Sequence, residues 1–186
     1  RYDAWPTPPE KLGVEVERLR GDEYLGANVT IPHKERVLPM LDGVGPQAAL
    51  IGAVNTIVKE GRRLIGHNTD TGGFVRSLRE RAGLEPRGKR VLLLGAGGAA
   101  RAAAFGLAGE GIAALTIANR TVERAESLAT AVGEAVPRTA AIPLDAASLK
   151  KALAAVDLVV NSTSLGMSHG EDAGDTPLTA DMVPKG

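Results

Sequence analysis

The sequence predicts an α/β protein built from two domains, and three observations support this prediction. An apolar stretch at 91–94 leads directly into a glycine-rich turn and an alanine-rich segment, which indicates a buried strand followed by a helix. From residue 87 onward, strand-like and helix-like segments alternate, as in a parallel sheet with right-handed crossovers. The segment 83–89 combines glycine, proline and charged residues, so we expect a domain boundary there. The expected domains are therefore 1–85 and 86–186.

Each domain divides into expected elements by its hydrophobic pattern and by its glycine and proline positions. In the first domain these are helices at 10–19, 33–41 and 71–82, a strand at 27–31, and a hairpin of 51–59 with 62–66 that turns at 60–61. In the second domain they are strands at 90–94, 113–118, 140–144 and 157–160, and helices at 98–109, 122–133 and 146–154. The second pattern predicts a doubly wound parallel sheet, whereas the first predicts a less regular α/β domain.

The composition excludes several classes of protein. Of the 186 residues, 22 are Lys or Arg and 22 are Asp or Glu, so the charge balance offers nothing to attract nucleic acid or an anionic membrane. The chain has no cysteine, which excludes disulfides and thiolate chemistry. Its apolar runs fall short of the roughly 18 residues of a membrane helix, and its three histidines lack the spacing of metal ligands. We expect a cytoplasmic protein without a metal, either a monomer or a homodimer.

The glycine-rich turn after the first strand of the second domain has the pattern of a dinucleotide-binding loop. Gly95 permits a sharp turn out of the strand, and Gly97 lets backbone N–H groups approach a diphosphate closely. The small Ala100 lets the helix pack against the strand, with its N-terminus directed at the phosphates. The strand before this loop and the helix after it make the pattern specific, since glycine spacing alone is common. We therefore expect a Rossmann-like domain.

The end of the next strand distinguishes between the two nicotinamide dinucleotides. An NAD site usually places an acidic residue about 20 positions after the glycines, where it binds the ribose hydroxyls. Here that position is Asn119, followed by Arg120 and, one helical turn later, Arg124. A neutral amide and two guanidinium groups can accept a 2′-phosphate without repulsion. The expected cofactor is therefore NADP.

The first domain concentrates neutral hydrogen-bonding residues at the ends of its expected elements. Asn28 and Thr30 fall on one expected strand, so their side chains should point to the same face. Lys34 follows at the start of an expected helix, and Asn55 and Asp70 lie at two further element ends. Amides and hydroxyls beside one Lys and one Asp can hold the hydroxyl groups of a small polyhydroxylated anion. We expect a substrate of this class.

These residues lie within six motifs that resemble, in the same order, the motifs of the shikimate dehydrogenase family. The motifs are 26–34, 52–56, 66–70, 95–100, 119–121 and 161–167. They span nearly the whole chain, which makes the resemblance highly specific. It implies NADP-dependent interconversion of 3-dehydroshikimate and shikimate, in the chorismate pathway to aromatic amino acids. It also implies two domains, an N-terminal α/β substrate domain and a Rossmann-like NADP domain.

The resemblance assigns roles to individual residues. By it, Lys34 and Asp70 form the catalytic pair, and they bind the substrate together with Asn28, Thr30 and Asn55. The residues that it assigns to the cofactor are Gly95, Ala96, Gly97, Gly98, Ala99, Asn119, Arg120, Thr121, Arg124, Thr163 and Met167. In this assignment the glycine loop binds the diphosphate, and the residues from 119 to 124 bind the adenosine end. Met167 lies near the nicotinamide.

The family also has segments that we expect this chain to lack. One is a strand before Arg1 with two serines that bind the substrate carboxylate. The others follow Gly186: two further sheet elements and a helix with a substrate-binding Gln. Three alternatives therefore stay open beside the main interpretation: a quinate or quinate/shikimate dehydrogenase, an inactive nucleotide-binding fragment, and a methylenetetrahydrofolate dehydrogenase. The last shares the two-domain plan but lacks this combination of Asn-Val-Thr and Asn-Thr-Asp motifs.

Overall fold

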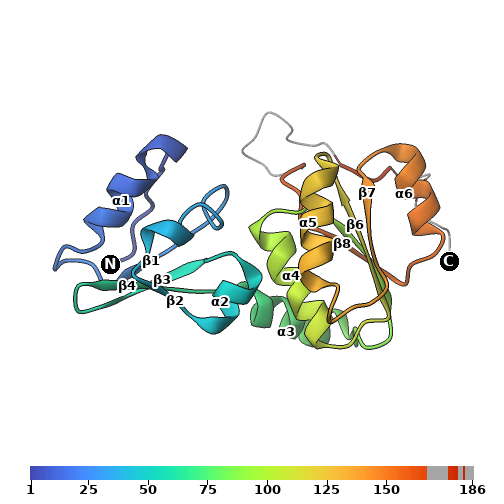
Figure 1. Cartoon of the computed structure of the whole chain (residues 1–186), viewed down its shortest axis with the longest axis horizontal. Coiled ribbons are helices and arrows are strands. Elements are labelled where there is room, and N and C mark those ends of the chain that lie inside the picture. Colours follow the sequence, from blue (N-terminus) through green and yellow to red (C-terminus); the bar gives the residue numbers. More distant parts are fainter. Residues whose placement is uncertain (167–175, 180–181, 183–186) are drawn as a thin grey trace. The chain divides into compact units, whose positions relative to one another are not determined.

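The computed structural model describes residues 1–166, 176–179 and 182, and the chain divides into two units, Arg1–Asp70 and Thr71–Gly186 (Figure 1). Each unit contains one four-stranded sheet. No helix within the described ranges is long and apolar enough to span a membrane. The α/β class expected from the sequence is confirmed in both units.

The first unit contains a mixed sheet with the strand order β1-β3-β4-β2. Its strands are β1 (Gly26–Asn28), β2 (Gly43–Val44), β3 (Thr56–Glu60) and β4 (Arg63–His67). Its helical segments are η1 (Pro9–Lys11), α1 (Leu12–Arg18), η2 (Leu38–Met40) and α2 (Pro46–Ile51). Strand β3 pairs antiparallel with β1 and β4, whereas β2 pairs parallel with β4. Ile57 of β3 and Leu64 of β4 pack with Leu12 and Val16 of α1 in one core. They share a face of the sheet because Leu64 pairs with Lys59, two residues after Ile57.

The helix expected at 33–41 does not form, and only the short 3₁₀ segment η2 is helical there. Pro39 has no N–H to donate, and its ring clashes with the carbonyl one turn earlier in an α-helix. The carbonyl of Lys34 instead accepts a hydrogen bond from the N–H of Val54 at 2.8 Å. Lys34 therefore lies in an irregular turn that a distant segment holds in place, not at a helix start.

Helix α2 was not expected: residues 46–50 were assigned to no element, and Ile51 was assigned to the following hairpin. The helix begins with Pro46 at its first position and ends at Gly52, whose φ of 70° is left-handed. Both residues are common at helix ends, since proline is tolerated in the first turn and glycine readily adopts the left-handed conformation that ends a helix. The first strand of the hairpin consequently begins at Thr56 rather than at residue 51.

The second unit contains a fully parallel sheet with the order β7-β6-β5-β8. Its strands are β5 (Arg90–Leu94), β6 (Ala114–Asn119), β7 (Thr139–Pro143) and β8 (Leu158–Asn161). Its helices are α3 (Asp70–Ala82), α4 (Gly98–Gly109), α5 (Val122–Val132) and α6 (Ala146–Leu153). From β5 to β8, every expected boundary is confirmed to within one residue.

Helices cover both faces of this parallel sheet. Figure 1 shows α6 on the opposite side of the sheet from α4 and α5. Val91 and Leu93 of β5 belong to the core that includes α4 and α5, whereas Leu92 and Leu94 pack with Leu149 of α6. These four β5 side chains are fully buried, which explains why this part of the strand is an unbroken apolar run.

The two units divide at the start of α3, whereas the expected domain boundary followed residue 85. The reason lies in the packing of α3 on α4. A Cβ atom on Gly106 would lie 3.1 Å from Val75 Cγ2 and 3.2 Å from Thr71 Cγ2. The missing side chain thus permits a close approach of the two helices, and Phe74 and Leu78 add to the same core. Helix α3 therefore packs with the parallel sheet.

Candidate functional site

A lysine and an aspartate form an ion pair in the first unit. The Nζ atom of Lys34 donates to Oδ2 of Asp70 at 2.7 Å, and the two side chains are 18% and 32% exposed. Lys34 lies in the turn before η2, and Asp70 is the first residue of α3. The pair is thus partly shielded from water but still accessible, which suits proton exchange with a bound molecule.

The amide of Asn55 joins this pair through the other oxygen of Asp70. Its Nδ2 group donates to Oδ1 of Asp70 at 2.8 Å and to Oγ1 of Thr69 at 2.9 Å. Its Oδ1 atom accepts from the N–H of Thr69 at 2.9 Å and from the Thr56 hydroxyl at 3.0 Å. Asn55 is buried, so these bonds satisfy both the donors and the acceptor of an amide that has little access to water.

A second buried amide fixes the position of Asp70. The Nδ2 group of Asn68 donates to the carbonyl of Ala53 at 3.0 Å, and its Oδ1 atom accepts from the N–H of Asp70 at 3.0 Å. The latter bond satisfies one of the N–H groups that the first turn of α3 leaves open. Asn68 therefore connects the start of this helix to the segment that carries Asn55.

The structure places the two other expected substrate residues differently. Asn28 ends β1 and is exposed; its Oδ1 accepts from the Tyr2 hydroxyl at 3.1 Å, and its Nδ2 lies 3.4 Å from Oγ1 of Thr56. Thr30 lies beyond the strand, also exposed, and its carbonyl accepts from the N–H of His33. The expectation that both belong to one strand is wrong, because β1 ends at Asn28. The N–H of residue 29 still bonds to the Asn55 carbonyl at 2.8 Å, which keeps Asn28 beside the network.

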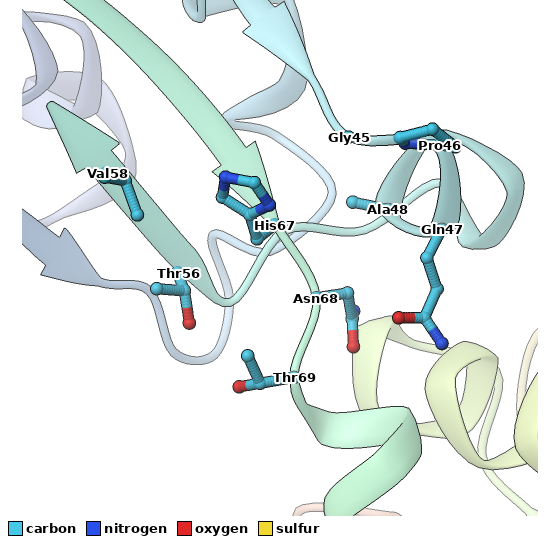
Figure 2. A pocket seen from close by; sticks show the side chains of 9 residues that line it. All are labelled: Gly45, Pro46, Gln47, Ala48, Thr56, Val58, His67, Asn68 and Thr69. Atoms are coloured by element: carbon cyan, nitrogen blue, oxygen red, sulfur yellow. The ribbon is translucent and has the colours of Figure 1, made fainter. Parts of the chain in front are cut away.

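A cavity of about 450 Å³ borders the same network, and Figure 2 shows its lining side chains. Thr56 and Thr69 both line it, at the start of β3 and after the end of β4. Its other lining residues are Gly45, Pro46, Gln47, Ala48, Val58, His67 and Asn68. Neither threonine was among the expected substrate residues. Their sequence signal is their position in the two motifs, where Thr56 directly follows Asn55 and Thr69 directly precedes Asp70.

The glycine loop in the second unit has the geometry expected of it. Gly95 has a φ of 105°, and a Cβ there would lie 2.8 Å from Oγ of Ser162. Gly97 is the N-cap of α4 and has no side chain that could cap the helix. Ala96 is buried in the core and Ala99 is exposed at the helix start. Only glycine fits at position 95, because both its backbone conformation and the nearby Ser162, which follows β8, exclude a side chain.

The other expected cofactor residues follow the carboxyl ends of neighbouring strands. Asn119 ends β6, and its Nδ2 donates to the carbonyl of Thr121, the N-cap of α5, at 2.9 Å. Arg120 and Arg124 are exposed. Thr163 follows β8, and its N–H and hydroxyl donate to Oδ1 of Asn161 at 3.0 and 2.7 Å.

The pairing of the strands brings these residues to one edge of the sheet. Leu94 lies opposite both Ala118 and Asn161, so β5, β6 and β8 end together. The glycine loop, the Asn119–Thr121 turn and Thr163 therefore lie along one edge, where parallel sheets commonly bind ligands. Met167 falls outside the described residues. Within the described ranges, no group of three or more acidic or histidine side chains is arranged to hold a metal ion.

Two family models match the chain. The model described as "Shikimate dehydrogenase substrate binding domain" matches residues 1–57, and "Shikimate / quinate 5-dehydrogenase" matches residues 78–168. The first match contains Lys34 and Asn55, and the second contains the glycine loop. The two matches thus follow the same order as the two units.

Curated relatives and solved structures agree with these matches. A shikimate dehydrogenase (NADP(+)) of Moorella thermoacetica is 50% identical over the entire chain, which covers 62% of that relative. The shikimate 5-dehydrogenase of Thermus thermophilus, solved with NADP(H) and shikimate, superposes with a TM-score of 0.80 at 39% identity, over 98% of this chain and 63% of its own. A quinate dehydrogenase of Corynebacterium glutamicum, solved with NAD, gives a TM-score of 0.73 at 33% identity, over 98% and 63%. The chain therefore spans about three fifths of the length of the relatives that it matches.

Proposed function

The chain belongs to the shikimate dehydrogenase family, and on this premise we propose that its full-length protein catalyses the reversible, NADP-dependent reduction of 3-dehydroshikimate to shikimate. The observation that carries the proposal is the 2.7 Å contact between Lys34 and Asp70, with Asn55 on the second carboxylate oxygen. The proposed enzyme is cytoplasmic, acts in chorismate and aromatic amino acid biosynthesis, and is a monomer or a homodimer. The first domain binds the substrate and the second binds NADP.

In this proposal the first unit recognises a small acid with several hydroxyl groups. Lys34 and Asp70 offer a charged donor and a charged acceptor, and Asn28, Thr30 and Asn55 offer amide and hydroxyl groups nearby. Such mixed donors and acceptors suit hydroxyl groups, because a hydroxyl group can donate one hydrogen bond and accept others. The set therefore favours a polyhydroxylated ring over an apolar or strongly anionic substrate.

The residues of the second unit fit NADP. The uncapped N-terminus of α4 follows a glycine turn, an arrangement that favours phosphate groups. The turn after β6 offers the neutral Asn119 with Arg120 and Arg124, and guanidinium groups pair well with a terminal phosphate. NADP supplies the hydride when reduced and accepts it when oxidised. Gly95, Ala96, Gly97, Gly98 and Ala99 would hold the diphosphate, and Asn119, Arg120, Thr121, Arg124, Thr163 and Met167 the rest of the cofactor.

The proposed task of Lys34 is proton transfer. Reduction of a ketone turns its oxygen into an alkoxide, which needs a proton, and the ammonium group of Lys34 holds one at Nζ. In the direction of oxidation, the neutral amine takes the proton back from the hydroxyl group. Asp70 orients the ammonium group through Oδ2 and is itself held by Asn55 through Oδ1. The catalytic pair is thus fixed at both carboxylate oxygens.

A second candidate substrate is quinate, because a matching family model and a structural neighbour both carry that name. Steady-state rates of the full-length protein with shikimate and quinate, each with NADP and NAD, test both candidates. We expect the highest kcat/KM for shikimate with NADP. A higher kcat/KM for quinate would favour the second candidate, and no turnover with any pair would refute both.

A further inference from the structure

We infer that Thr56 is a positioning residue for the catalytic pair, and this inference rests on the proposed function. Its hydroxyl group helps to keep the Nδ2 end of the Asn55 amide facing Asp70. Thr56 is the first residue of β3 and follows Asn55 directly. The hydroxyl donates its single proton to Oδ1 of Asn55 at 3.0 Å. This bond helps to hold the oxygen end of the amide toward Thr56.

The other end of the amide then has to face Asp70. With Oδ1 held by Thr56 and by the N–H of Thr69, the Nδ2 group points at Oδ1 of Asp70, 2.8 Å away. A flipped amide would place its oxygen against the Asp70 carboxylate, and two acceptors repel each other. It would also place its NH₂ group against the N–H of Thr69. The observed orientation additionally gains the hydrogen bond from the Thr56 hydroxyl.

The same hydroxyl links a second amide of the expected substrate site. The Nδ2 group of Asn28 lies 3.4 Å from Oγ1 of Thr56, on the acceptor side of the hydroxyl. A hydroxyl group that accepts from one amide and donates to another connects the two in one hydrogen-bond network. Thr56 thus lies between Asn28 and Asn55, but the Asn28 amide is held independently by the Tyr2 hydroxyl and the Asn55 carbonyl. The main effect of Thr56 is therefore expected on Asn55.

Loss of this hydroxyl should act through Asp70 on Lys34. A carboxylate with one oxygen no longer held by Asn55 rotates more freely, and Lys34 is bonded to the other oxygen. The effect should therefore appear mainly in kcat. Its expected size is a loss of about three- to tenfold, which is the range for one neutral hydrogen bond.

The test uses the full-length protein with Thr56→Val, Thr56→Ser and the matched control Thr7→Val. Valine has nearly the shape of threonine and is well accepted in strands, and Thr56→Ala serves as a second variant without the hydroxyl. Thr7 is in the same unit, and its hydroxyl bonds to the Trp5 carbonyl, outside the network. We expect Thr56→Val and Thr56→Ala to lower kcat about three- to tenfold, and Thr56→Ser and Thr7→Val to stay within about twofold of the unmodified protein.

A double-mutant cycle with Asn55→Ala shows whether Thr56 acts through the amide. If it does, adding Thr56→Val to Asn55→Ala changes kcat by less than about twofold, because the group that it positions is already gone. Three results would each overturn the inference: an unchanged kcat in Thr56→Val and Thr56→Ala, a Thr56→Ser variant as impaired as Thr56→Val, or full additivity with Asn55→Ala. An inactive unmodified protein would instead refute the proposed function itself.

Discussion

Replacing Asp70 with asparagine should lower kcat strongly, because the side chain holds two donors at once. Lys34 donates to one oxygen at 2.7 Å and Asn55 to the other at 2.8 Å. An asparagine in this place keeps one acceptor and presents an NH₂ group to the second donor. A hydrogen bond to a charged group contributes about 1.5–3 kcal/mol, and each 1.4 kcal/mol corresponds to about a factor of ten. We therefore expect Asp70→Asn to reduce kcat about ten- to a hundredfold.

The assay is steady-state oxidation of shikimate by the full-length protein, with the melting temperature measured in parallel. Asp42→Asn is the matched control, since Asp42 also pairs with a cation, Arg20, in the first unit and has a similar exposed fraction, 34% against 32%. Asp42 additionally accepts from the N–H of Leu64, so its loss should lower stability and leave kcat unchanged. Full kcat in Asp70→Asn, or an equal loss of kcat in both variants, would refute this prediction.

Three further predictions concern proton transfer, cofactor choice and acid stability. Lys34→Ala should lower kcat about a hundred- to ten-thousand-fold, the usual contribution of a positioned general acid, while equilibrium titration shows a smaller change in substrate affinity. Replacing Arg120 and Arg124 with alanine should weaken NADP binding in a fluorescence titration and leave NAD binding nearly unchanged; equal losses would contradict recognition of the 2′-phosphate. Hydrogen bonds from Arg90 lower the pKa of Asp157 below its usual value, so this carboxylate stabilises the fold above about pH 4 and loses that effect as the pH falls through its folded-state pKa. The melting-temperature deficit of Asp157→Asn should therefore be present at neutral pH and shrink in acid; a deficit independent of pH would contradict this.

The second unit could be predicted almost completely from the sequence, and the first could not. Strand β5 of the second unit is buried on both faces, so its apolar run alone predicts a strand there. The turn around Lys34 depends instead on a hydrogen bond from Val54, twenty residues later in the sequence. Hydrophobic spacing at 33–41 resembles a helix, but a contact with a distant segment and the position of Pro39 decide against it. Local patterns predict structure well only where local forces determine it.

The same distinction explains which parts of the candidate site the sequence could indicate. It supplied the residue types of Lys34, Asn55 and Asp70, but their proximity depends on the register of the hairpin. A turn at 60–61, as expected, would pair Thr56 with Ile65, whereas the observed pairing is Thr56 with His67. A slip of two residues keeps every side chain on its face but moves Asn55 away from Thr69 and Asp70 along the partner strand. The observed register is therefore what allows one buried amide to join the threonines to the carboxylate, and the orientation of that amide is a property of the folded hairpin rather than of any single motif.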